Sequence, residues 1–189
     1  MKFYAFVLAL GLSVIAFADD MVEFRSASQG EYRYADWAHN GKKWATDLYY
    51  VGAPGNNELS ACVGYQFKIV TPYACATAAK EDKELGAKAA ASIAWEKKAW
   101  KADAYIAYFK PLRGSAKAYT TADAANLTRT LGKGWEAGIS TGFLRQDGKW
   151  NPLAGPLVRK NDRLGFWALS YRLGPANELR LNRVFLFKH

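Results

Sequence analysis

The sequence has very little histidine, cysteine or methionine, with two residues of each among 189. It also lacks a Gly-x-Ser-x-Gly motif, a phosphate-binding glycine loop and an EF-hand spacing. His39 stands beside Asn-Gly, where we expect an exposed turn, and His189 is the last residue, so neither is an obvious catalytic base. We therefore expect no catalytic residue, no metal ligand and no cofactor, and we predict that the protein is not an enzyme.

Long apolar runs are also missing after residue 18. Lys2, the apolar run from Phe3 to Phe17, and Ala18 after it together predict a secretory signal peptide over residues 1–18, with one domain over residues 19–189. The run is shorter than the roughly 20 residues that a membrane-spanning helix needs. No later segment is long enough either, so a mature chain that enters a membrane must do so as strands.

Acidic residues are outnumbered, because 26 Lys and Arg stand against 17 Asp and Glu, for a formal charge of +9. Such an excess favours anionic partners. Since an exported protein does not normally meet nucleic acid, we expect lipid phosphates or small anionic solutes instead. The alternative is that the lysines only solvate the rims of the fold.

Aromatic residues are abundant, with 7 Trp, 11 Tyr and 10 Phe, and they favour pleated surfaces. Alternating segments are separated by turn signals, of which Asn40-Gly41 and Asp147-Gly148 are typical of hairpins. We predict ten to twelve strands, near residues 31–39, 42–52, 58–69, 72–80, 84–96, 98–110, 114–131, 135–146, 149–160, 163–173 and 177–187. Residues 114–131 are one long strand or two short ones, and residues 21–29 are a further candidate.

Residues 85–110 indicate how the side chains divide between two faces. If this hairpin turns at Lys97-Lys98, Trp95 faces Trp100 and Ala87 faces Tyr108, so one face is apolar along its whole length. The other face carries Lys88, Ser92, Glu96, Lys101, Asp103 and Tyr105. This alternation over about ten residues is typical of transmembrane barrel strands. The predicted fold class is all-β, an antiparallel up-and-down transmembrane β-barrel with short turns.

Tryptophans recur near the ends of the predicted hairpins. We expect the turns at Asn40-Gly41, Lys97-Lys98 and Asp147-Gly148 to share one rim, with their indoles at the depth of a membrane interface. The first girdle then contains Trp37, Trp44, Trp95, Trp100 and Trp150. The second, on the other rim, contains Tyr108, Trp135 and Trp167.

As a whole the chain resembles bacterial outer-membrane β-barrel proteins. The resemblance rests on the signal peptide, the hairpins, the aromatic rims and a last strand, Leu179 to Phe187, that ends in aromatic residues. In that class the closing strand usually ends with an aromatic residue that the assembly machinery reads, whereas Lys188 and His189 follow Phe187 here. The resemblance implies the outer membrane of a diderm bacterium, with its lipids and the barrel-assembly machinery as partners.

The face opposite the apolar one is predicted to line a lumen with small residues and charges of both signs. Buried charges need water or partners, so a hydrated lumen follows. A slight excess of basic groups favours anions, because charged rings set pore selectivity. We interpret the protein as a small passive pore for hydrophilic solutes, anions among them. The predicted lumen-lining residues are Asp36, Asp47, Lys88, Lys101, Asp103, Lys117, Glu136 and Arg159, with Lys68, Glu96, Asp123 and Arg180 on the same face.

Cys62 and Cys75 are the two cysteines of the chain. Export places them in an oxidising compartment, and their separation suits neighbouring strands of one hairpin. The sequence is compatible with a disulfide bond between them and with two reduced thiols. A metal site is not expected, because no His or second Cys pair lies near them.

Two other functions remain in contention. Inward charges that pair into a plug would give a non-conducting barrel with a structural or lipid-interacting role. A soluble, lipocalin-like exported barrel would instead hold an apolar ligand, as Gly134-Trp135 and Gly148-Lys149-Trp150 hint, with apolar residues inside and charges outside. Alternation alone does not distinguish inside from outside.

Overall fold

The computed structural model describes residues 19–28, 33–53, 56–80, 84–175 and 177–187. The expected signal peptide, residues 1–18, and the terminal His189 lie outside the described residues. No helix in the described part of the chain is long and apolar enough to cross a membrane.

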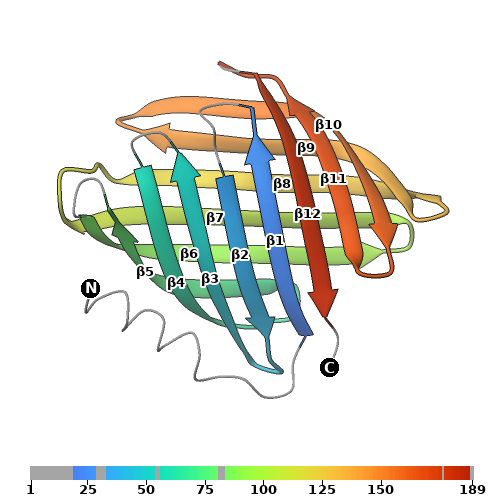
Figure 1. The fold of residues 1–189 in the computed structure, drawn as a ribbon, viewed down its shortest axis with the longest axis horizontal. Helices are drawn as coiled ribbons and strands as arrows, with labels where there is room; N and C mark the ends of the chain where they lie inside the picture. Colours follow the sequence, from blue (N-terminus) through green and yellow to red (C-terminus); the bar gives the residue numbers. More distant parts are fainter. Residues whose placement is uncertain (1–18, 29–32, 54–55, 81–83, 176, 188–189) are drawn as a thin grey trace.

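Twelve antiparallel strands form one closed sheet. They are β1 (Asp19–Ala27), β2 (Arg33–Asn40), β3 (Trp44–Ala53), β4 (Asn56–Tyr65), β5 (Val70–Ala79), β6 (Glu84–Lys97), β7 (Trp100–Arg113), β8 (Tyr119–Gly132), β9 (Trp135–Gln146), β10 (Lys149–Asp162), β11 (Gly165–Arg172) and β12 (Glu178–Phe187). Each strand pairs with its sequence neighbours, and β1 pairs with β12 to close the barrel (Figure 1). The predicted all-β, up-and-down barrel is confirmed.

Two strand assignments settle the alternatives left open by the sequence. Residues of the 114–131 segment form one strand, β8, and the 21–29 segment contributes to β1. We name the end where β1 begins and β12 ends the terminal end; its turns are residues 41–43, 66–69, 98–99, 133–134 and 163–164. The opposite end is the distal end.

The expected grouping of tryptophans into rims is wrong. Each strand carries the chain to the opposite end, so the turns after β2 and β6 share the terminal end while the turn after β9, at Asp147-Gly148, is distal. Trp150 therefore lies at the distal end with Tyr108 nearer to it, and Trp135 and Trp167 lie at the terminal end. The exposed tryptophans at the terminal end are Trp44, Trp95, Trp100, Trp135 and Trp167, with Trp37 half-buried among them.

The registers of two hairpins also differ from those predicted for the tightest possible turns. Trp95 pairs with Ala102 rather than Trp100, because the turn lies at residues 98–99, where Lys98 adopts a φ of 58°. Trp37 pairs with Leu48 rather than Trp44, because residues 41–43 form a longer connection. Both shifts are by an even number of residues, so every side chain stays on its predicted face.

The outer surface is apolar and the inner surface is polar. Large apolar side chains such as Ile139 and Leu169 are about half exposed on the outside. Glu136 and Arg172, which face inward, are buried to 2% and 1% exposure. This polarity is the reverse of that expected for a lipocalin-like barrel.

The two prolines within β10 differ in what they cost the sheet. Ala154 exchanges backbone hydrogen bonds with Leu173 on the β11 side, so Pro152 and Pro156, two residues away in either direction, face that side too. Pro152 lies beyond this bridge, where β10 is not paired with β11. Pro156 lies between the bridge and the ladder that begins at Leu157, so its missing N–H interrupts the β10–β11 ladder there.

A glycine on the inner face of β6 makes room for an aromatic ring. A Cβ added to Gly86 would lie 2.1 Å from Cε2 of Phe109. The Phe109 ring is 2% exposed and stacks on Tyr119 with centroids 4.9 Å apart. Gly86 is therefore part of the packing of the inner wall, where an aromatic side chain covers the glycine of the neighbouring strand.

We expect Gly86→Val to push the Phe109 ring off β6 and to lower the free energy of unfolding by about 1–3 kcal/mol, the usual cost of overpacking. Urea unfolding of the refolded barrel in detergent micelles, followed by tryptophan fluorescence, measures the change. Ala87→Val is the matched control, because Ala87 lies on the same strand but is exposed on the outer face. Equal stability of the two variants would show that the Phe109 packing contributes nothing.

Candidate functional site

A cavity of about 720 Å³ occupies the interior of the barrel, and side chains from all twelve strands line it. The lining reaches Asn40, the last residue of β2, at the terminal end, and Gln146, the last residue of β9, at the distal end. Because the lining extends to both strand ends, the cavity follows the length of the barrel. This lumen is the candidate functional site.

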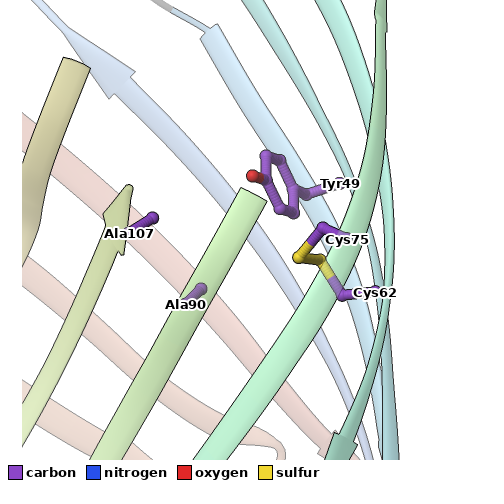
Figure 2. Close-up of a cluster of buried hydrophobic side chains, with 5 residues drawn as sticks. All are labelled: Tyr49, Cys62, Cys75, Ala90 and Ala107. Atoms are coloured by element: carbon purple, nitrogen blue, oxygen red, sulfur yellow. A yellow bond between two sulfur atoms is a disulfide. The ribbon is translucent and has the colours of Figure 1, made fainter. Parts of the chain in front are cut away.

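One wall of the lumen is packed around a disulfide. Cys62 and Cys75 are directly opposed in the β4–β5 ladder and form a disulfide bond. Figure 2 shows the Tyr49 ring beside this disulfide, with Ala90 and Ala107 on the strands next along the wall. The small alanine side chains leave the lumen open at this level, and the disulfide links two strands of the wall.

A network of three arginines and three carboxylates joins β1, β11 and β12 to β8 across the barrel. Arg25 pairs with Glu23 (2.8 Å) and with Asp123. Arg180 pairs with Asp123 (2.9 Å) and with Glu178 (2.8 Å). Arg172, the most deeply buried member, pairs with Glu178 (2.5 Å) and donates to the backbone oxygen of Asp123 (2.6 Å). The three positive charges are thus balanced by three negative ones.

Lys88 forms the centre of a second buried network. Its ammonium pairs with Glu58 and donates to the hydroxyl of Tyr49 at 2.9 Å. Ser60 donates to the same carboxylate at 3.1 Å and shares a 2.9 Å hydrogen bond with Thr77. Lys88 and Glu58 are 6% and 7% exposed, so each requires the other as its counter-charge.

Two further ion pairs lie on β7, β9 and β10. Arg159 pairs with Asp103 at 2.6 Å, and Asn126 donates to the other oxygen of that carboxylate. Lys101 pairs with Glu136 at 2.8 Å, and Thr128 and Asn161 also donate to Glu136. Each of these lysine and arginine side chains inside the barrel therefore forms an ion pair with a carboxylate.

Asp36 and Asp47 differ from the other lumen carboxylates. They are diagonal neighbours of the β2–β3 ladder, 7% and 8% exposed, and one oxygen of each has no hydrogen-bond partner. Within the described residues neither forms an ion pair with a Lys, Arg or His side chain. The described part of the chain also brings together no group of three His, Cys, Asp or Glu side chains suited to a metal ion.

Most predicted lumen residues face the interior, but they do so in different surroundings. Asp36, Asp47, Lys88, Asp103 and Arg159 line the cavity. Lys101 and Glu136 are inside the barrel near the terminal end, paired with each other rather than lining the cavity. Of the same predicted face, Asp123 lines the cavity and Arg180 is buried beside it.

Three predicted inward residues and one predicted turn residue are placed differently. Lys117 lies in the connection between β7 and β8, exposed, with its ammonium 2.6 Å from Asp147. Lys68 lies in the turn after β4, and Glu96 is exposed at the end of β6, so both are at the terminal rim. His39 is a strand residue, 5% exposed, with Nδ1 2.7 Å from Asp20, because β2 extends to Asn40.

Several lumen residues were missed by sequence reasoning. Glu23 and Arg25 lie in β1, whose segment was only a candidate strand, although their alternation with Val22, Phe24 and Ser26 is visible in the sequence. Glu178 lies two residues from Arg180, and Arg172 lies two residues from Ser170, so each shares the inner face with that neighbour. The same alternation could therefore have identified both. Glu58, in contrast, carries no local signal that it will meet Lys88, thirty residues away.

No protein-family model matches the chain, and no curated protein matches it by sequence. Solved structures do match it. A structure of the KdgM porin superposes with a TM-score of 0.64 at 9% identity, covering 88% of this chain and 99% of that one. A structure of the NanC porin gives 0.60 at 10% identity, covering 89% and 99%. A further structure, of the KdgM porin in complex with disordered oligogalacturonate, gives 0.61 at 7% identity, covering 90% and 99%.

The chain has the fold of these porins. The resemblance to bacterial outer-membrane β-barrel proteins, predicted from the hairpins and aromatic rims, is therefore confirmed for the fold.

We expect Lys88→Met to lower the free energy of unfolding by about 3–5 kcal/mol, because it leaves Glu58 as a buried charge without its partner. The double variant Lys88→Met, Glu58→Gln removes both charges and should recover most of that loss. Urea unfolding in micelles measures both. The control is Lys117→Met, which breaks the exposed pair with Asp147 and should change stability by less than about 1 kcal/mol. If the double variant were as unstable as the single one, the ion pair would not be the reason.

Proposed function

We propose that the protein is a passive pore of the outer membrane, through which small hydrophilic solutes, anions among them, cross by diffusion. The observation that carries the proposal is a cavity, with charged side chains such as Asp36, Lys88 and Arg159 in its lining, that follows the barrel from one end to the other inside a wall whose outer face is apolar. Irregular or open sheets do not span a lipid bilayer, but a closed barrel does, because every strand finds a backbone partner.

The outer surface fits a membrane location. Exposed indoles gather at the terminal end, and Trp150 and Tyr108 lie towards the distal end, as expected for side chains at two membrane interfaces. Four of these indoles have a cationic side chain over the ring: Trp100 with Arg129, Trp135 with Lys160, Trp167 with Arg183, and Trp150 with Arg145. Rings at this depth next to basic side chains suit the boundary between acyl chains and lipid headgroups.

Attraction of anions is supported by the charge of the terminal mouth. The five turns at this end contain six basic residues and no acidic one: Lys42, Lys43, Lys68, Lys98, Lys133 and Arg163. All six are exposed. Glu96 and Asp162 lie at the same rim, at the ends of β6 and β10, so the charge there is an excess of basic groups. Such an excess concentrates anions and raises their rate of entry. One KdgM porin structure of the same fold is a complex with oligogalacturonate, which is polyanionic.

The non-conducting alternative rests on the ion pairs of the lumen. Some of these pairs cross the barrel, because Arg25 of β1 and Arg180 of β12 both reach Asp123 of β8. They do not fill the interior, since a cavity of about 720 Å³ remains between them and the Lys88–Glu58 side of the barrel. We therefore favour the open pore over the plugged barrel.

Conductance in a planar bilayer is the decisive experiment. We expect the refolded protein, residues 19–189, to insert and give discrete current steps, with a reversal potential in a KCl gradient that indicates chloride over potassium. Insertion without current would favour the structural barrel. A protein that stays soluble without detergent would contradict the membrane location.

The triple variant Lys42→Glu, Lys43→Glu, Arg163→Glu tests the mouth. Because these side chains sit in exposed turns, the fold should persist, while the chloride-to-potassium permeability ratio should fall at least about twofold at low salt. The effect should shrink in about 1 M KCl, where the screening length is only about 3 Å. An unchanged ratio at low salt would show that the mouth does not control selectivity.

A further inference from the structure

Among the described carboxylates that line the cavity, Asp36 and Asp47 are the two without a basic partner. Arg25, Lys88 and Arg159 line the cavity, and each is engaged by a carboxylate. Asp36 and Asp47 line the same cavity without such a partner among the described residues. Their surroundings therefore leave an excess of negative charge on the β2–β3 wall.

Three buried oxygen atoms in this part of the lumen have no hydrogen-bond partner. They are Oδ1 of Asp36, Oδ1 of Asp47 and the hydroxyl of Tyr105. Tyr105 packs against the cluster that contains Tyr49, the ladder partner of Asp36. Buried polar atoms without partners are rare in folded proteins, and each one calls for a water, an ion or a ligand.

From these contacts we infer that Asp36, Asp47 and Tyr105 form a subsite for a protonated amino group of the solute. An ammonium group has three N–H donors and a positive charge, and the subsite offers three free acceptors, two of them carboxylate oxygens. Hydrogen bonds from an ammonium to a carboxylate are among the stronger ones in proteins. A metal ion suits the site less, because two carboxylates and a phenol provide too few hard ligands.

Two adjacent carboxylates cannot both remain ionised in a buried site without a counter-charge. The positive charge of a bound ammonium group supplies it. The covalent structure of the solute is unchanged, so the subsite only binds and releases.

The inference rests on the proposed pore and narrows its solutes to those that carry an amino group. The basic terminal mouth attracts anionic groups, whereas the Asp36–Asp47 wall binds cationic ones. A solute that carries both kinds of charge, such as an amino acid or an amino sugar acid, matches the two regions better than a simple anion does.

The test uses methylammonium chloride as the probe and the refolded protein in detergent micelles, with saturation-transfer NMR as the binding readout. We expect saturable binding of methylammonium at neutral pH and none of tetramethylammonium, which has the same charge but no N–H donor. The double variant Asp36→Asn, Asp47→Asn keeps the side-chain shape and should weaken binding at least about tenfold, as expected for losing hydrogen bonds to a charged group.

The control is Asp147→Asn, which removes an exposed carboxylate at the distal mouth and should leave binding unchanged. A difference in gel mobility between heated and unheated samples shows that each variant is folded. Absence of methylammonium binding to the native protein, equal binding of tetramethylammonium, or binding that survives the double substitution would each overturn the subsite.

Current recordings in a planar bilayer test the proposed pore separately from the proposed subsite. Micellar binding without any current would refute the pore and leave the subsite standing. Current that methylammonium does not reduce, combined with no binding in micelles, would refute the subsite and leave the pore standing. With both correct, methylammonium reduces the current through the native protein and not through the double variant.

Discussion

The backbone pairing of β1 with β12 is the interaction on which the rest of the structure depends. Eight residue pairs, from Asp20–Phe187 to Ala27–Arg180, close the sheet on itself. Without them both strands would present unpaired N–H and C=O groups, which a bilayer does not satisfy. Closure also fixes which face is inside, so that every second side chain points into a space that no lipid enters.

The enclosed space determines how charge can be arranged. Buried charges are tolerated only with partners, and the lumen meets this requirement through ion pairs that connect distant parts of the chain, such as Arg25 with Asp123. These pairs hold opposite walls in place without filling the centre. Basic side chains without such constraints are found instead in the exposed turns of the terminal end, where water solvates them.

In the proposed pore, the division of charge between mouth and interior separates two tasks. Exposed charges act at long range and mainly influence how often an ion arrives. Buried groups act at short range through hydrogen bonds and influence which solute stays. The Asp36–Asp47 wall belongs to the second kind, because its free oxygens are buried and Asp36 pairs with Tyr49 in the β2–β3 ladder.

Sequence alone determined the strands, their turns and the face of most side chains. Alternation has a period of two residues, so a register error of two or four, as in the β6–β7 and β2–β3 hairpins, leaves the faces unchanged. The tertiary structure alone decided which rim each tryptophan occupies and which charges meet. The rim at which a turn lies depends on whether the number of strands before it is odd or even. The 114–131 segment contributes one strand rather than two, so the turn before Trp150 lies at the opposite rim from the one predicted. Ion pairs such as Arg25–Asp123 join β1 to β8, strands far apart in the sequence, and closure of the barrel brings them together.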